Sequence, residues 1–182
     1  MQKLFERKLF WFVILTIIGS LFLSSVGVLA VDDYGAKGAK QAEDYTLEEM
    51  LVYAIQDEYL ARAEYELIMN EYGKQRPFSN IIRAEEYHIQ LLIPLFEKYE
   101  MAVPEDTSSE HVILPADIES ALQIGVEAEV ANIGMYENFL TEDLPEDVAE
   151  VFVELKRGSE NHLRAFKNGL ERNGGYGQGY KG

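Results

Sequence analysis

Four segments of the chain repeat apolar residues every three or four positions, and this spacing limits the fold more than any other feature. Such a repeat places the apolar side chains along one face of an α-helix. The expected helices cover residues 46–72, 80–99, 118–140 and 145–173. No segment has the sustained alternation of apolar and polar residues that is typical of strands. The sequence therefore predicts an all-α fold in which four helices bury their apolar faces against one another.

The limits of these helices follow from capping signals. Each segment has a signal that favours a helix start. Thr46 and Glu49 have the spacing of a capping box, Ser79 and Asp117 are suited to the N-cap position, and Pro145 is suited to the first helical turn. Gly73 follows the first helix, and Gly174 follows the fourth, where glycine commonly ends a helix. The longest connection, residues 102–116, links the second helix to the third.

Polar residues interrupt each apolar face near its middle. They are Glu58 in the first helix, Glu85 with His88 in the second, Glu129 with Asn132 in the third, and Ser159 with His162 in the fourth. A buried carboxylate without a partner is costly, and a cation shared between several helices removes that cost. Glu85 and His88 are three residues apart, so one helical turn directs both toward the same point.

Each of these residues also has a simpler interpretation. A single glutamate on an amphipathic helix is most often solvated, and Asp57, Glu86 and Glu127 compete with their neighbours for the inward position. A structural bundle with buried, protonated glutamates is the alternative to a metal site. Two of the three histidines nevertheless fall on these faces, which favours a metal site. The candidate ligands are Glu58, Glu85, His88, Glu129 and His162.

The first 30 residues differ from the rest of the chain. Lys3, Arg7 and Lys8 precede an uncharged run from Leu9 to Ala30, and the run ends in a small-x-small pattern. Residues 1–30 are therefore predicted to be an export signal cleaved after Ala30. A retained membrane anchor is the alternative, because a run of this length can just span a bilayer. Either way the remainder is expected outside the cytoplasmic membrane, and it contacts the membrane only if residues 1–30 are retained.

Composition excludes several classes of function. The 32 acidic residues outnumber the 16 basic ones, giving a net charge of −16, which argues against binding to nucleic acid. With no cysteine, thiol catalysis, disulfides, Fe–S clusters and cysteine-bound zinc are ruled out. Residues 31–45 lack a helical period and are predicted to be a linker. Residues 46–173 are expected to form the bundle, and residues 174–182 a Gly/Tyr-rich tail.

Three segments resemble an uncharacterised prokaryotic ferritin-like family, a domain of unknown function. They are Asp57-Glu58-Tyr59-Leu60-Ala61-Arg62, Glu85-Glu86-Tyr87-His88 and Gly158-Ser159-Glu160-Asn161-His162-Leu163-Arg164-Ala165-Phe166. The third is the most specific, and the resemblance covers roughly residues 47–167. It implies a ferritin-like four-helix bundle with a di-metal centre. In ferritin-like oxidases the last helix supplies its own Glu-x-x-His, but Ser159 stands at that glutamate position, so the ligand set is one carboxylate short. Water and Glu154 are the candidates for the missing ligand, and a one-metal site or a weakly held second ion is the alternative to a complete di-metal centre.

Two classes of function are compatible with these observations. The first is an exported non-haem di-iron oxidoreductase that acts on ferrous iron, oxygen or peroxide, with manganese or zinc as alternative metals. In it, Glu85 and Glu129 are candidates to bridge two ions, with Glu58 and His88 on one side and His162 on the other. The second is a non-catalytic metal-binding or surface-assembly domain. Either class is compatible with a homo-oligomer.

Overall fold

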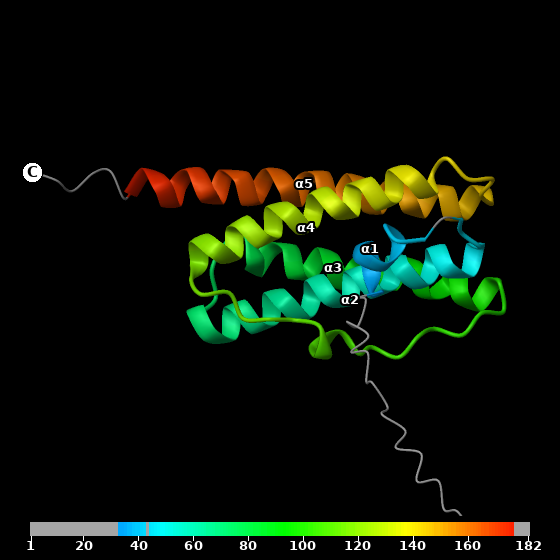
Figure 1. The fold of residues 1–182 in the computed structure, drawn as a ribbon, viewed down its shortest axis with the longest axis horizontal. Helices are drawn as coiled ribbons and strands as arrows, with labels where there is room; N and C mark the ends of the chain where they lie inside the picture. Colours follow the sequence, from blue (N-terminus) through cyan, green and yellow to red (C-terminus); the bar gives the residue numbers. More distant parts are fainter. Residues whose placement is uncertain (1–32, 43, 177–182) are drawn as a thin grey trace, which may run out of the picture. The chain divides into compact units, whose positions relative to one another are not determined.

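The computed structural model describes residues 33–42 and 44–176, which form five α-helices and one short 3-10 helix, with no strand among them (Figure 1). The elements are α1 (Gly35–Ala39), α2 (Leu47–Tyr72), α3 (Phe78–Lys98), η1 (Ser108–Glu110), α4 (Ile118–Phe139) and α5 (Glu146–Tyr176). The all-α prediction is confirmed for these residues. The expected signal or anchor at residues 1–30 lies outside them. Within the described part of the chain, no helix combines the length and hydropathy needed to cross a bilayer.

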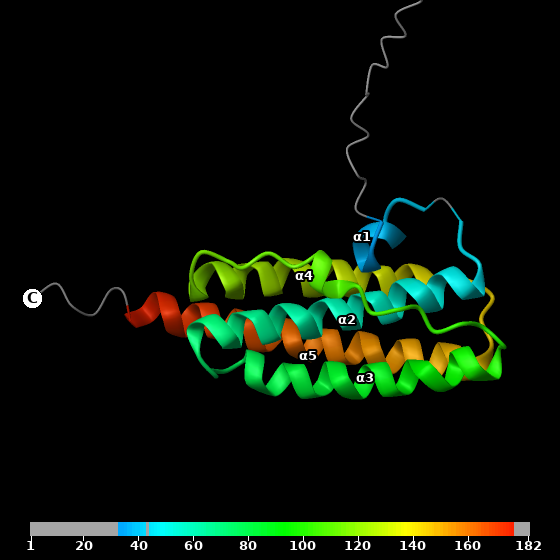
Figure 2. The same ribbon diagram turned by 90° about the horizontal axis from the view of Figure 1, so that it is seen from below.

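The four long helices form a bundle of two antiparallel pairs, α2 with α3 and α4 with α5 (Figures 1 and 2). Residues 99–117 join the pairs, and this connection returns along the length of the bundle, where η1 packs against α2. As a result α3 and α4 run in the same direction. The long connection that the sequence indicated between the second and third helices is therefore what brings the two pairs together side by side.

Local capping explains most of the helix limits. Thr46 and Glu49 form the predicted capping box, in which the Thr46 hydroxyl accepts from the Glu49 N–H and Glu49 Oε2 accepts from the Thr46 N–H at 2.8 Å. Asp117 caps α4 by accepting from the Ser120 N–H at 2.7 Å. Ser79 was expected to be the N-cap of α3 but lies inside it. Pro77 precedes this helix instead, where a residue without an N–H leaves no donor unsatisfied.

Two stretches are more helical than the sequence predicted. Residues 35–39, inside the expected linker, form α1, which packs on α2 and α4. Side chains of α2 hold it: Asp57 Oδ1 accepts from the Ala36 N–H at 2.8 Å, and Gln56 Oε1 accepts from the Gly35 N–H at 3.2 Å. At the other end α5 continues to Tyr176, beyond its expected end before Gly174. Glycine costs a helix only about 1 kcal/mol per position, so it does not force a stop.

The bundle core consists of two apolar clusters with a polar layer between them. The first cluster includes Leu51, Phe96, Phe139 and Phe152, and the second, at the other end of the helices, includes Tyr65, Phe78, Leu122 and Phe166. Seven buried polar side chains of the four long helices make up the polar layer: Glu58, Glu85, His88, Glu129, Asn132, Ser159 and His162. They are the residues whose interruption of the apolar faces the sequence had indicated.

Candidate metal centre

The structure brings all five predicted ligands together in the polar layer. Each is at most 7% exposed: Glu58, Glu85, His88, Glu129 and His162. Their side chains point into the bundle because the residues three and four positions away in each helix are mostly apolar and buried, and so lie on the same inward face. The competing neighbours Glu86 and Glu127 are exposed on the outer faces of their helices, and Asp57 is half-buried.

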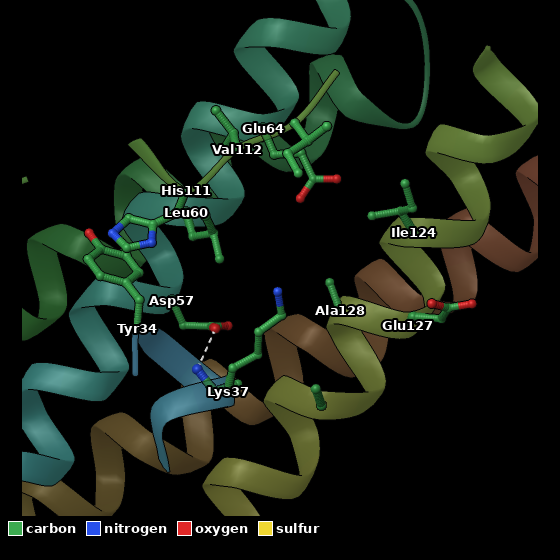
Figure 3. A pocket seen from close by; sticks show the side chains of 13 residues that line it. Tyr34, Lys37, Asp57, Leu60, Glu64, His111, Val112, Ile124, Glu127 and Ala128 are labelled. Carbon is green, nitrogen blue, oxygen red and sulfur yellow. Dashed lines mark hydrogen bonds between the residues drawn. The ribbon is translucent and has the colours of Figure 1, made fainter. Parts of the chain in front are cut away.

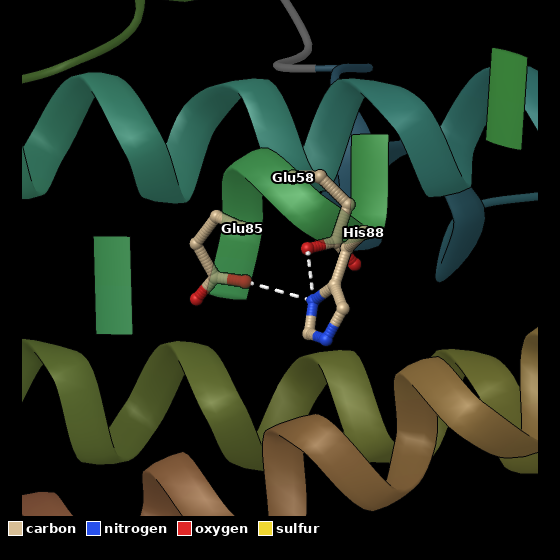
Figure 4. Close-up of side chains that lie close together, drawn as sticks. All are labelled: Glu58, Glu85 and His88. Carbon is tan, nitrogen blue, oxygen red and sulfur yellow. Dashed lines mark hydrogen bonds and ion pairs between the residues drawn. The ribbon is translucent and has the colours of Figure 1, made fainter. Parts of the chain in front are cut away.

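Two groups of three ligands share Glu85. In the first triad, His88 Nδ1 lies 3.0 Å from Glu58 Oε2 and 2.9 Å from Glu85 Oε2 (Figure 4). In the second triad, His162 Nδ1 lies 3.1 Å from Glu85 Oε1 and 3.3 Å from Glu129 Oε1. Within each triad one ligand atom from every residue lies within 4.8 Å of the others. Each oxygen of Glu85 therefore faces a different histidine, which is the arrangement of a carboxylate between two cations.

Two buried tyrosines orient the outer carboxylates. The Tyr136 hydroxyl donates to Glu58 Oε1 at 2.9 Å, and the Tyr65 hydroxyl donates to Glu129 Oε1 at 3.2 Å. Such hydrogen bonds from outside a ligand set fix the orientation of the ligands. From helical position alone, both tyrosines are expected to pack in the core, and the Tyr65 hydroxyl is expected to be within reach of the site two turns from Glu58. Tyr65 lies seven residues after Glu58 on the same helix face, yet its hydroxyl contacts Glu129 of another helix. Helical spacing alone does not predict this contact.

A neutral hydrogen-bonded pair occupies the side of the centre where a further carboxylate was missing. The Ser159 hydroxyl donates to Asn132 Oδ1, and Asn132 Nδ2 donates to Asp57. A cavity of about 20 Å³ lies beside this pair, and Glu58, Glu85 and Glu129 also line it. This volume is enough for one water-sized molecule with polar partners. The open side of the centre is therefore the side of Ser159.

Burial and mutual contact shift the proton affinities in opposite directions. Burial raises the pKa of Glu58 to about 8, more than the neighbouring His88 lowers it. Burial acts in the same sense on Glu85, but hydrogen bonds from His162 and His88 outweigh it and lower the pKa of Glu85 to about 2. Burial alone would lower the pKa of both histidines, yet the adjacent carboxylates raise the pKa of His88 and that of His162 to about 10. Without metal, protonated imidazoles thus neutralise the carboxylates.

The donor set fits transition-metal ions. Three carboxylates and two imidazoles supply oxygen and nitrogen ligands, the combination that suits Fe²⁺, Mn²⁺ and Zn²⁺. Both Nδ1 atoms already point at carboxylate oxygens, so a cation can replace the Nδ1 proton without rotation of the ring.

Gly158 makes room for the His88 ring. A Cβ atom at this position would lie 2.5 Å from His88 Cε1 and 2.6 Å from His88 Nε2. Gly158→Ala is therefore expected to displace the imidazole, destabilise the fold by about 1–3 kcal/mol through overpacking, and lower the metal content of the first triad. Metal analysis and thermal melting measure both effects. Gly134→Ala is the matched control, because a Cβ atom there meets no atom within 4 Å. Equal metal content in the two variants would contradict this role of Gly158.

The chain is similar to a protein family and to an archaeal protein. The family described as "Uncharacterized protein domain (DUF2202)" matches residues 48–181. The uncharacterized protein MJ0754 of Methanocaldococcus jannaschii is 28% identical over 163 residues, which cover 81% of this chain and 86% of that protein. The crystal structure of the hypothetical protein MJ0754 from Methanococcus jannaschii resembles the present structure with a TM-score of 0.63 and 27% identity, over 73% of this chain and 85% of that one. Neither description states an activity.

Proposed function

The chain belongs to the family of the uncharacterized domain DUF2202, and we propose that its bundle is a ferritin-like domain that binds two iron ions in the polar layer. The connectivity supports this proposal, because ferritin-like bundles join two helix pairs through one long crossover. Residues 99–117 form such a connection here. The ligand pattern supports it further, since glutamates and a Glu-x-x-His pair project inward from facing helices in those bundles.

Each ligand has a distinct role in this proposal. Glu85 would be shared by the two metal positions, because it belongs to both triads. Glu58 and His88 would hold one ion, and Glu129 and His162 would hold the other. Glu129, the second bridging candidate from the sequence, belongs to the second triad alone. Tyr136 and Tyr65 hold the outer carboxylates by hydrogen bonds, so the ligands are oriented before a cation arrives.

The proposed activity is oxidation of ferrous iron with oxygen or peroxide, carried out in an exported protein. Bound iron would supply the change of oxidation state. The chain supplies a site that excludes bulk water, with ligands at most 7% exposed, and leaves one water-sized space beside Ser159 and Asn132 for a small oxidant. The observation that carries the proposal is the sharing of Glu85 by two buried triads. The short ligand set is equally compatible with a non-catalytic metal-binding domain, which is the second candidate.

Iron titration followed by oxidant distinguishes these candidates. Purified metal-free protein is titrated with Fe²⁺ under anaerobic conditions, and two ions per chain are expected to bind. Oxygen or peroxide is then admitted, and oxidant consumption is measured together with ferric absorbance over repeated additions of Fe²⁺. Iron binding without turnover would support the non-catalytic domain. Failure to bind Fe²⁺, Mn²⁺ and Zn²⁺ would contradict the metal centre itself.

Metal binding is expected to release protons. At pH 7 the metal-free centre holds protons on His88, His162 and Glu58, whose pKa values are raised to about 10, about 10 and about 8. Cations must displace them, so about two to three protons per chain should appear in a weakly buffered titration with Zn²⁺, and apparent affinity should rise with pH. An affinity that stays constant between pH 6 and pH 8 would contradict this expectation.

The same shifts set the pH dependence of the metal-free fold. The folded-state pKa of each histidine, about 10, exceeds the ordinary value of 6.5. Their charged pairs therefore stabilise the fold fully below pH 6.5, and this contribution is lost as the pH rises through about 10. Denaturant unfolding of metal-free protein should show the decline, and saturating Zn²⁺ should reduce it. A metal-free stability that rises over this range would be the opposite result.

A further inference from the structure

A second cavity adjoins the polar layer from outside. It has a volume of about 370 Å³ and lies between α1, α2, α4 and the segment that carries His111 (Figure 3). Two of its lining residues, Asp57 and Ala128, also line the 20 Å³ cavity inside the centre. The two cavities thus meet at one wall, made by these two side chains.

The wall between the two cavities is partly polar. Asp57 accepts from the Ala36 N–H of α1 with one oxygen and from Asn132 Nδ2 with the other. Its carboxylate therefore connects the outer cavity with the hydrogen-bonded pair that borders the open side of the centre. Ala128 contributes only a methyl group to this wall, on the α4 side.

The outer cavity is acidic as well as apolar. Glu64, Asp57 and Glu127 line it together with Lys37 and aliphatic side chains. Figure 3 shows the Glu64 carboxylate directed into the space between α2 and α4. Its Oε1 is buried, and no hydrogen-bond partner for this oxygen exists among residues 33–42 and 44–176. A buried carboxylate oxygen without a donor is an attractive position for a passing cation.

We propose that divalent cations reach the metal centre through this outer cavity, attracted by Glu64 and passing between Asp57 and Ala128. The inference rests on the proposed function, because it presupposes that the five ligands bind metal. A route is required because those ligands are at most 7% exposed. Asp57 and Ala128 line both cavities, so this route leads directly to the open side of the centre. Above the pKa of Glu64, which burial raises to about 7, the acids of the outer cavity outnumber Lys37 and favour cations over neutral molecules and anions.

Transit residues and ligands differ in their kinetic effects. A residue that an ion passes but does not contact at equilibrium changes the association and dissociation rates by the same factor and leaves Kd unchanged. Ala128→Leu, which thickens the wall, is expected to slow both rates about tenfold at unchanged stoichiometry. At pH 8.5, where Glu64 is mostly ionised because burial raises its pKa only to about 7, Glu64→Gln removes a charge at nearly constant volume. It is expected to slow association about threefold at low salt, with less effect at high salt.

Stopped-flow mixing of the full chain with Co²⁺ tests this route. Quenching of tyrosine fluorescence reports association, because Tyr65 and Tyr136 contact the ligands, and an excess of chelator reports dissociation. Glu150→Gln, an exposed acid of α5 outside the cavity, is the matched control and should bind at the wild-type rate. Wild-type protein that binds no Co²⁺ would overturn the metal centre and this route with it. Normal Co²⁺ binding by wild type together with unchanged rates in Glu64→Gln and Ala128→Leu would overturn the route alone.

Discussion

Replacing Glu85 by alanine is expected to reduce the bound metal from two ions per chain to none. Each Glu85 oxygen faces a different histidine, so this single change removes a ligand from both triads. The affinity of each position should fall by about 100-fold or more, the upper range for loss of a residue that supports a metal site. His88→Ala should remove only the ion of the first triad. Metal analysis after equilibrium dialysis measures all of these contents.

Glu86→Ala is the matched control for this prediction. Glu86 is the adjacent glutamate in the same helix but is exposed on its outer face, so its removal changes the net charge equally without touching the centre. It should retain both ions. If Glu85→Ala and Glu86→Ala bind the same amount of metal, the polar layer is a buried hydrogen-bonded network and not a metal centre.

Introducing a carboxylate at Ser159 should have opposite effects with and without metal. Ser159 is buried at the open side of the centre, and Ser159→Glu completes a Glu-x-x-His pair with His162. Without metal, a further buried carboxylate should destabilise the fold by roughly 3 kcal/mol, since the charge of His162 is already paired with Glu85 and Glu129. With metal it should tighten the second triad, and the melting temperature should recover as the ion binds to the folded state.

Thermal melting across a titration with Mn²⁺ checks both halves of this prediction. Without metal, the variant should have a lower melting temperature than wild type. On saturation with metal, its melting temperature should rise by more than that of wild type. Ser159→Gln, which adds similar bulk without charge, separates the electrostatic cost from overpacking. A Ser159→Glu protein whose metal-dependent melting shift equals that of wild type would show that residue 159 does not influence the ions.

The fold was predictable where neighbouring residues determine the structure. Thr46 and Glu49 are three residues apart, and their capping box depends on nothing else in the chain. The inward positions of Glu58 and His162 followed from apolar residues three and four positions away. The helix start at Phe78 was missed. The helix α1 was missed because it is held by Asp57 and Gln56, which lie 21 residues further along the chain. A local pattern contains no information about such contacts.

The candidate site divides in the same way. Its five ligands could be predicted because all of them sit on helix faces that the apolar period defines. The contact of Tyr136 with Glu58 spans 78 residues, and the room that Gly158 leaves for His88 is a property of two packed helices. Neither has a signature in the spacing of residues. The outer cavity could not be predicted from the sequence either, since it forms where α1 and the residues before α4 cover the bundle.

The division of the apolar core by the polar layer has a consequence for cooperativity. Each end of the bundle has its own hydrophobic cluster, while the middle contains charged pairs whose mutual attraction is largely offset by the cost of burying them. The metal-free domain should therefore loosen at its centre, and hydrogen exchange in the middle turns of the four helices should be faster than at the cluster cores. Two ions held by residues of all four helices would join both ends into one unfolding unit. The metal supply would then determine whether the two ends of this domain unfold together or separately.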